Sequence, residues 1–255
     1  MKKLIQIILT AAFVLSFSAA YAAEDAITPP DMDWPHEGIF GTYDKAALQR
    51  GYQIYRENCA ACHSMRYLSY RNLQEIGFTE AEVKAIANEY MVQDGPNDEG
   101  EMFERSGQPA DRFVSPYPND NAARYANNGA LPPDLSLIAK ARGNGTDYIY
   151  ALLNGYEDAP ADETLANGQY WNKYFLGHKI AMPPPISDGA IMYSDGTAAS
   201  VEMASADVAQ FLTWAAEPQQ DARKKMGLKV ILYLMLLTLI MYLAKRKIWR
   251  DIKKK

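Results

Sequence analysis

The stretch Cys59-Ala60-Ala61-Cys62-His63 decides the fold of this 255-residue chain, because it contains both of the chain's cysteines. Two thiols at this spacing can each form a thioether with one vinyl group of a single porphyrin, and the histidine that follows is then brought under the iron as its proximal ligand. The sequence therefore predicts one covalently bound haem c, with Cys59 and Cys62 as anchors and His63 as a ligand.

A redox-active dithiol and one half of a zinc site are the competing interpretations of Cys-x-x-Cys. A zinc site needs a second pair of ligands, which is not evident in the sequence, and a thioredoxin-like dithiol needs a strand and a helix around the motif. Covalent haem is the preferred interpretation. Because haem would use both thiols, the sequence also predicts that the domain has no internal disulfide.

The residues before the motif have the spacing of an amphipathic helix that ends at the cysteines. Asp44 can cap this helix. Its buried face is predicted to consist of small, aliphatic and aromatic residues, namely Ala47, Leu48, Gly51, Tyr52 and Tyr55. We expect this helix to deliver the two cysteines to the haem.

A second helix is predicted near the end of the domain, capped by Ser205 and stopped by Pro218. One face of it would carry Val208, Phe211, Leu212 and Ala215. Two shorter helices are predicted over 79–91, where Thr79 and Glu82 have the spacing of a capping box, and over 147–154. No alternating pattern is strong enough to predict a sheet, so the fold class is mainly α.

The two ends of the chain are apolar segments that do not belong to a soluble core. Residues 1–22 have the basic start, apolar stretch and small-x-small site of a secretory signal peptide, although an uncleaved anchor is the alternative. Residues 226–246 are predicted to be a transmembrane helix, with a buried helix of a soluble domain as the alternative. Their apolar part, Leu228–Ala244, would span about 26 Å.

The charges around this second segment predict its orientation. A basic tail at 247–255 follows it and outweighs the basic residues before it, which places the C-terminus in the cytoplasm. Residues 23–222 would then form a haem-binding domain outside the cytoplasm.

The exported domain is strongly acidic, because residues 23–222 contain 30 Asp and Glu against 13 Lys and Arg. Such a charge excludes a nucleic-acid partner and favours a basic soluble partner, unless the acidity serves only solubility. Two acidic clusters are candidate docking sites. One is a predicted solvated loop with Asp94, Asp98, Glu99, Glu101 and Glu104, and the other consists of Glu157, Asp158, Asp162 and Glu163.

The second axial ligand of the iron is predicted to be Met182. It precedes three prolines, 183–185, and such a rigid extended segment is suited to hold one side chain against a haem face. A thioether ligand raises the potential of the iron. The chain also has ten other methionines and two other histidines, of which His178 is the rival ligand and would imply a lower potential.

Four motifs, spread over nearly the whole exported part, resemble those of the cytochrome c1 family of the cytochrome bc1 complex, in its bacterial form. They are Trp34-Pro35-His36-Glu37-Gly38, Cys59-Ala60-Ala61-Cys62-His63-Ser64-Met65, Ala126-Asn127-Asn128-Gly129-Ala130-Leu131-Pro132-Pro133-Asp134-Leu135-Ser136 and Ile180-Ala181-Met182-Pro183-Pro184. The resemblance implies a class I cytochrome c-like haem domain with loop insertions, plus one C-terminal transmembrane helix.

The same resemblance assigns roles to further residues. It implies that His63 and Met182 are the axial ligands and that Arg142 pairs with a haem propionate, where a plain surface arginine is the alternative. It also implies that Tyr148 lies near the haem and that the segment from Asn127 to Pro133 lines the haem pocket near Pro132.

The resemblance implies an electron-transfer function. The haem would accept an electron from the Rieske iron-sulfur protein and pass it to a basic cytochrome c, within a dimeric membrane complex that contains cytochrome b. The chain would be no enzyme on its own. An independent membrane-anchored c-type cytochrome is the alternative, and a haem enzyme is disfavoured because it needs an open position on the iron.

Overall fold

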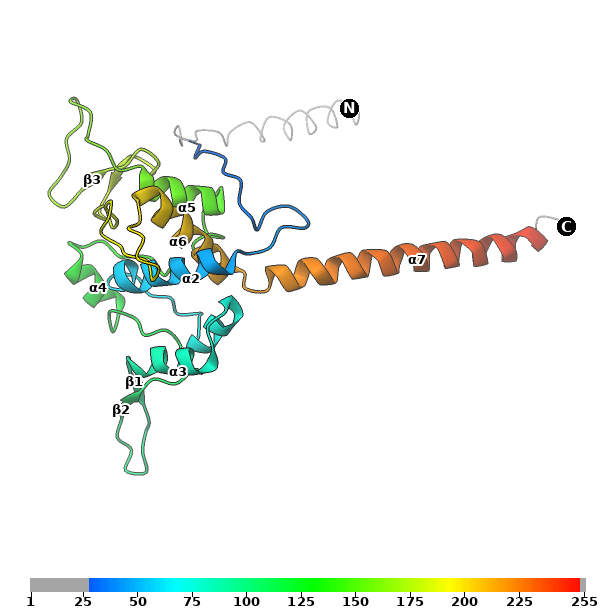
Figure 1. Ribbon diagram of the computed structural model, residues 1–255, viewed down its shortest axis with the longest axis horizontal. Helices are drawn as coiled ribbons and strands as arrows, with labels where there is room; N and C mark the ends of the chain where they lie inside the picture. The colour runs from blue at the N-terminus through cyan, green and yellow to red at the C-terminus, as the bar shows by residue number, and fades with distance from the viewer. Residues whose placement is uncertain (1–27, 253–255) are drawn as a thin grey trace, which may run out of the picture.

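Helix α2, Lys45–Ile54, forms as the sequence predicts and leads into the cysteine motif. The structure is a computed structural model and describes residues 28–252 (Figure 1). The Asp44 carboxylate accepts hydrogen bonds from the backbone amides of Ala46 at 2.9 Å and Ala47 at 3.4 Å, so the predicted cap is confirmed. A π-helical turn, Tyr55–Cys59, follows α2 without a break. Such turns are rare and are frequent at functional sites.

Helix α6, Val201–Ala216, packs against α2 at very short range. Gly51 allows this approach, because a Cβ atom there would lie 2.2 Å from the carbonyl oxygen of Asp207 and 2.6 Å from Cβ of Phe211. The contact is reinforced by a bidentate ion pair, in which Arg50 donates to the buried Asp207 carboxylate at 2.7 and 2.8 Å. The hydroxyl of Tyr193 donates to the same carboxylate at 2.7 Å. The pairing of the first and last helices is the centre of the domain.

The predicted start of α6 is wrong by about one turn. Ser200 is the N-cap, and its hydroxyl accepts a hydrogen bond from the Met203 amide at 3.2 Å. Ser205 lies inside the helix, fully buried beside Ala204 and Val208, which are also fully buried. The sequence alone does not distinguish a serine that caps a helix from a small serine that is buried inside one.

The two shorter predicted helices form where the sequence predicts them, but their first or last residues differ from the prediction. Helix α3 runs over Glu80–Asn88 and has both halves of the predicted capping box. Helix α5 runs over Gly145–Asn154 and starts two residues before the predicted 147–154. The structure adds a 3₁₀ helix at Tyr70–Ile76 and helix α4 at Asp120–Ala126.

Two small antiparallel hairpins were not predicted. Strands β1, Met91–Asp94, and β2, Phe103–Ser106, pair with Met91 opposite Ser106, which explains why α3 ends three residues before its predicted end. Strands β3, Tyr170–Trp171, and β4, Lys179–Ile180, form the second hairpin. The acidic segment predicted as a solvated loop belongs to the first hairpin, which projects from the body (Figure 1). Its exposed tip contains Asp98, Glu99 and Glu101, whereas Asp94 lies in β1 and Glu104 in β2.

Aromatic rings fill the core between α2, α6 and the 3₁₀ helix. Tyr70 stacks on Phe113 with ring centroids 4.8 Å apart, and Tyr52 and Tyr55 both contact Phe113 and Phe211. All five side chains are buried. This core fixes the end of α2, and therefore the position of the cysteine motif.

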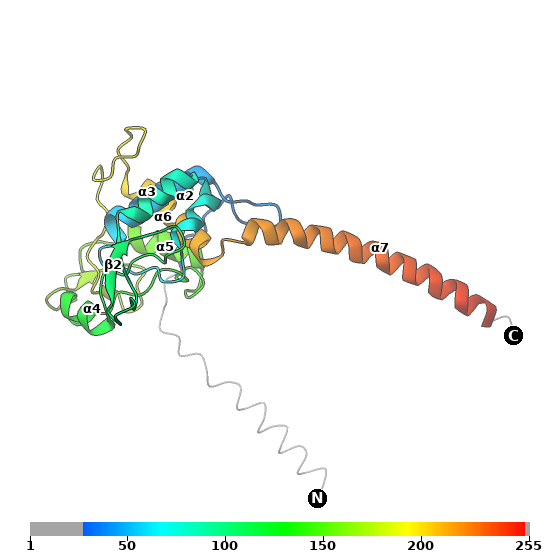
Figure 2. The same cartoon turned by 90° about the horizontal axis from the view of Figure 1, so that it is seen from below.

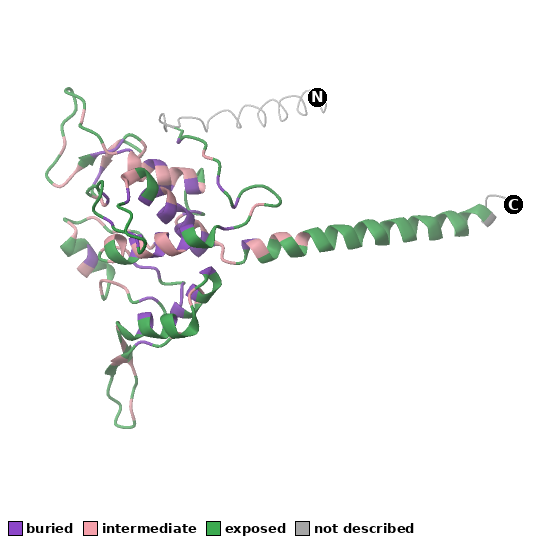
Figure 3. Cartoon of the chain, viewed as in Figure 1, coloured by how far each residue is buried: buried purple, intermediate pink, exposed green. Residues whose placement is uncertain are grey.

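Helix α7, Gln220–Ile252, leaves the domain as a single long helix that curves gently along its length (Figure 2). Its apolar side chains are exposed along nearly its whole length (Figure 3), so it is not the buried helix of a soluble domain. At 33 residues it is about 50 Å long, which is ample for a bilayer. It contains the predicted span 226–246 and fits a single-pass membrane anchor. The predicted signal peptide at 1–22 and the last residues of the basic tail lie outside the described residues.

Candidate functional site

The cysteine motif forms a compact turn at the end of α2. The amides of Cys62 and His63 both donate to the carbonyl of Cys59, at 3.1 and 2.8 Å, and the buried Tyr55 hydroxyl donates to the carbonyl of His63 at 3.3 Å. Both thiols are free and partly exposed. The turn therefore offers two thiols and one imidazole at the surface of the domain.

The surroundings of Cys59 do not support a reactive dithiol. The packed protein around it desolvates the thiol and raises its pKa to about 12, whereas redox-active cysteines have a lowered pKa. Zinc is not supported either, since the described residues include no group of three or more His, Cys, Asp or Glu side chains that could hold a metal ion.

The His63 ring is oriented and protonated so that its Nε2 atom can bind a metal. Its Nδ1 lies 2.8 Å from the carbonyl oxygen of Pro133, and because a carbonyl can only accept, Nδ1 carries the proton. Nε2 of the neutral ring is therefore unprotonated, and its lone pair is available to a metal. Desolvation lowers the pKa of His63, although the bond to Pro133 opposes this shift, so the neutral form is favoured. A neutral imidazole oriented by a carbonyl is the usual form of a histidine ligand.

Asp134 fastens the segment after Pro133 onto the cysteine motif. Its carboxylate accepts hydrogen bonds from the Ser64 hydroxyl at 2.8 Å and from the backbone amides of Arg66 and Ser136, both at 2.9 Å. Burial raises the pKa of Asp134, but these hydrogen bonds outweigh it and hold the pKa below its usual value. Asp134 therefore keeps the Pro133 carbonyl in place to accept the hydrogen bond from His63 Nδ1.

Replacing Asp134 with Asn should lower the free energy of unfolding by about 2 kcal/mol, because an amide cannot accept all three bonds. The lowered pKa means that the contribution of Asp134 is present above the usual aspartate pKa and is lost as the pH falls through the folded-state value. Stability should thus decline less steeply below about pH 4 in Asp134→Asn than in the parent. Thermal unfolding followed from pH 7 to pH 3 measures both effects.

Asp120→Asn is the matched control, because Asp120 is exposed and its ion pair with Arg66 spans 3.4 Å. This change should lower the free energy of unfolding by less than about 1 kcal/mol. Equal losses in the two variants would contradict the fastening role of Asp134.

The segment that contains Met182 lies against the cysteine motif. Asn58, the residue before Cys59, donates its side-chain amide to the carbonyl of Pro185 at 3.1 Å. The Tyr156 hydroxyl donates to the carbonyl of Met182 at 3.1 Å. The Met182 side chain is partly exposed. The fold thus brings together two regions that are more than a hundred residues apart in sequence.

The remaining predicted residues lie around the same region. Arg142 is exposed, donates to the carbonyl of Ala141 at 3.0 Å and lies beside Tyr148, whose pKa is raised by burial against the opposing effect of Arg142. Tyr148 in turn lies near Tyr156. Pro132 is half-buried next to the proline that contacts His63.

The rival ligand His178 has a structural environment of its own. Its ring stacks on Trp171 with centroids 4.8 Å apart, and its Nδ1 lies 3.2 Å from the carbonyl oxygen of Asn172. Its backbone is left-handed, with a φ of 59°. These contacts give His178 a role in the turn of the β3–β4 hairpin.

Sequence reasoning missed the positioning roles of Asn58, Pro133, Asp134 and Tyr156. The run from Ala126 to Ser136 contains two of them and was singled out as a motif, but nothing in its spacing showed that it contacts His63. The signal available in the sequence was Asp134, an acidic residue placed between Pro133 and Leu135.

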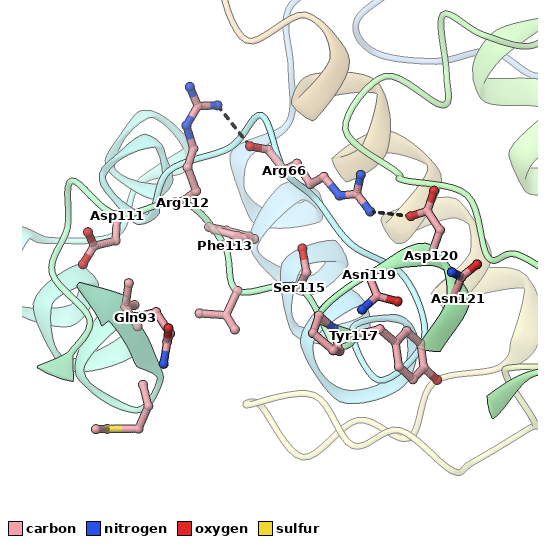
Figure 4. Close-up of a pocket in the computed structure, with 14 residues that line it drawn as sticks. Arg66, Gln93, Asp111, Arg112, Phe113, Ser115, Tyr117, Asn119, Asp120 and Asn121 are labelled. Atoms are coloured by element: carbon pink, nitrogen blue, oxygen red, sulfur yellow. Dashed lines mark hydrogen bonds and ion pairs between the residues drawn. The ribbon is translucent and has the colours of Figure 1, made fainter. Parts of the chain in front are cut away.

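A pocket of about 920 Å³ lies elsewhere, between β1 and the segment 111–121 (Figure 4). It contains the ion pair of Arg66 with Asp120, and Arg112 donates to the carbonyl of Arg66 at 3.1 Å. None of the seven predicted site residues lines it. It is therefore separate from the candidate haem site.

Comparisons with known proteins identify the family of this chain. The model of the Cytochrome C1 family matches residues 34–252. The chain is 50% identical to "Cytochrome c1-2, heme protein, mitochondrial" of Solanum tuberosum, over 92% of this chain and 91% of that protein. It is 47% identical to "Cytochrome b-c1 complex catalytic subunit, mitochondrial" of Candida albicans, over 96% and 87%.

A bacterial relative has a different length. The chain is 46% identical to "Cytochrome b/c1" of Bradyrhizobium diazoefficiens over 94% of its own residues, but it spans only 38% of that protein. The family match covers the cysteine motif, the Pro133 segment, Met182 and α7 together. The chain therefore belongs to the cytochrome c1 family and is a haem-bearing electron-transfer protein.

Proposed function

We propose that this chain holds one haem c covalently through Cys59 and Cys62, with His63 and Met182 as the axial ligands. The hydrogen bond from His63 Nδ1 to Pro133 carries the proposal. It leaves the lone pair of Nε2 available to the iron, in the residue that directly follows the second cysteine. When bound, the haem supplies a one-electron carrier whose iron alternates between the ferric and ferrous states.

The surrounding residues would hold and tune this site. Asp134 and Tyr55 position the His63 segment, and Tyr156 positions the Met182 segment. The exposed guanidinium of Arg142, beside Tyr148, is suited to pair with a propionate at two points. Pro132 would line the pocket on the side of His63.

The contacts of the two candidate ligands favour Met182 over His178. The Met182 backbone is tied to Tyr156, and its segment is tied to the residue before Cys59. The His178 ring is stacked on Trp171 instead. A thioether ligand implies a high potential, as an acceptor from a high-potential donor requires.

We further propose that the chain is a subunit of a dimeric ubiquinol–cytochrome c oxidoreductase that contains cytochrome b and the Rieske iron-sulfur protein. The name of the Candida relative supports membership of a cytochrome b-c1 complex. The chain would accept electrons from the Rieske protein and pass them to a soluble or tethered basic cytochrome c. Quinol oxidation would belong to cytochrome b, so this chain would be a redox subunit rather than an enzyme.

The proposed location follows from the charges at the two ends of α7. The haem domain would lie in the periplasm and the basic C-terminus in the cytoplasm, with α7 crossing the inner membrane once. An independent membrane-anchored cytochrome that feeds another oxidase or reductase is the second candidate. It would share the haem and the anchor, but would not copurify with b-type haem.

Covalent attachment can be tested directly. Denatured full-length chain from native membranes should keep its haem through acidic organic extraction, and its mass should exceed the peptide mass by one haem. Cys59→Ser should lose one thioether and hold much less haem. Complete release of haem from the unmodified chain would contradict the proposal.

The acidic cluster after Tyr156 is the preferred docking site for the basic acceptor. Glu157 and Asp158 are exposed, and they follow the tyrosine that contacts Met182. The double change Glu157→Gln and Asp158→Asn should slow electron transfer to a basic cytochrome c several-fold at low ionic strength. Because salt screens such charges, the difference from the parent should disappear at high ionic strength. Stopped-flow reduction kinetics measure both rates.

The matched control removes two charges from the tip of the β1–β2 hairpin, by Asp98→Asn and Glu99→Gln. Both residues are exposed, and the hairpin projects away from the body (Figure 1). This variant should keep the parent rate. A larger loss in the hairpin variant would move the docking site to the hairpin.

A further inference from the structure

The loop before α2 exposes two adjacent large apolar side chains. Ile39 is 76% exposed and Phe40 is 81% exposed, at the tip of the loop formed by residues 37–42. Single exposed apolar residues are common on protein surfaces, but a pair at the tip of a fixed loop marks a contact surface.

The 37–42 loop is held in one conformation. The Glu37 amide donates to the carbonyl of Trp34 and the Thr42 amide to that of Pro35, both at 3.0 Å, so the loop is closed at its base. A Cβ atom at Gly41 would lie 1.8 Å from the carbonyl oxygen of Glu37, which shows how tightly the two sides pack. The Trp34 indole donates to Asp147 of α5 at 2.6 Å. The exposed pair is therefore presented rigidly.

Side chains from the first two turns of α7 bind this loop. The Lys224 ammonium donates to the carbonyls of His36 at 2.5 Å and Gly41 at 3.1 Å. Gln220 donates to the same His36 carbonyl at 2.7 Å. In both views the loop lies beside the first turns of α7 (Figures 1 and 2).

The position along α7 places the loop at the membrane surface. Lys224 precedes Leu228, the first residue of the apolar part of α7, by four residues, or about 6 Å along the helix. This is comparable to the thickness of the headgroup zone on one side of a bilayer. Lys225 is exposed at the same level, where an ammonium group can meet lipid phosphates, and Lys229 is exposed about 7 Å further along the helix.

We infer that the 37–42 loop is a second membrane contact, in which Ile39 and Phe40 enter the lipid interface beside α7. The apolar pair and the first turns of α7 belong to segments that the hydrogen bonds of Lys224 hold together, and both segments expose apolar side chains. A single helix allows the domain to tilt, whereas two contacts fix one face of the domain toward the lipid. The inference requires that α7 spans the bilayer, but it does not depend on the haem ligands.

The test uses a nitroxide label on Phe40→Cys in the full-length, haem-loaded chain, placed in nanodiscs of phosphatidylcholine with phosphatidylglycerol. The haem thioethers leave the new cysteine as the reactive thiol, and the parent chain should not be labelled. The collision rates of the label with oxygen, which concentrates in lipid, and with a water-soluble nickel chelate are then compared by electron paramagnetic resonance.

The matched control is Tyr125→Cys, because Tyr125 is 93% exposed and lies in α4, on the side of the domain opposite α7 (Figure 1). The ratio of oxygen to chelate collisions should be several-fold higher at position 40 than at position 125. Equal ratios would overturn the inference and leave the loop free for a protein partner. A label at position 40 that neither collider reaches would overturn it as well, because the loop would then be covered by protein.

Discussion

Met182→Leu should retain covalent haem but lose most of the high potential of the site. Leucine preserves the volume of the side chain and removes the sulfur, so the iron would lose its thioether ligand. The choice of axial ligands changes the redox potential of haem over a range of roughly 0.8 V. The midpoint potential of the variant should fall by a substantial part of that range. Electron acceptance from a high-potential donor would then become unfavourable. A spectroelectrochemical titration of the purified variant measures the change.

Two control substitutions separate ligation from general disturbance. Met203→Leu changes a half-exposed methionine of α6 and should leave the potential unchanged. His178→Gln removes the rival ligand and should also leave it unchanged, apart from the lost stacking on Trp171. A normal potential in Met182→Leu together with a lowered one in His178→Gln would identify His178 as the ligand instead.

Gly51→Val should destabilise the domain more than any other single change considered. Its Cβ atom alone would lie 2.2 Å from a backbone oxygen of α6, and a backbone atom cannot rotate away as a side chain can. The two helices would have to separate, which would also strain the ion pair of Arg50 with Asp207. The free energy of unfolding should fall by about 3 kcal/mol, the upper end for overpacked cores. Chemical denaturation followed by circular dichroism measures this loss.

Gly143→Val is the matched control, because no atom lies within 4 Å of a Cβ placed there. This variant should retain nearly all of the parent stability. Comparable losses in the two variants would contradict the account, because the loss would then not depend on the contact between α2 and α6.

The elements that sequence predicts well are those fixed by local interactions. The caps of α2 and α3 each join residues three or fewer positions apart, so Asp44, Thr79 and Glu82 could be recognised directly. The start of α6 could not, because Ser200 and Ser205 are both competent caps. Only the packing against α2, which buries Ser205, distinguishes them.

The candidate site divides in the same way. The thiols and His63 are adjacent in sequence, so their chemistry could be read from spacing alone. The bond from His63 to Pro133 spans 70 residues, and that from Tyr156 to Met182 spans 26. Such contacts depend on how the loops fold over the helices, and no local pattern encodes them. The β1–β2 hairpin was missed because its strands have only four residues each and little burial.

The central claim is that this chain is the covalent haem c subunit of a complex with cytochrome b. The most direct test is a ferrous-minus-ferric visible spectrum of the chain, purified in mild detergent from its own membranes. We expect a c-type absorption band accompanied by b-type bands from a copurifying partner. A c-type band alone, under conditions that preserve complexes, would contradict it and favour an independent carrier.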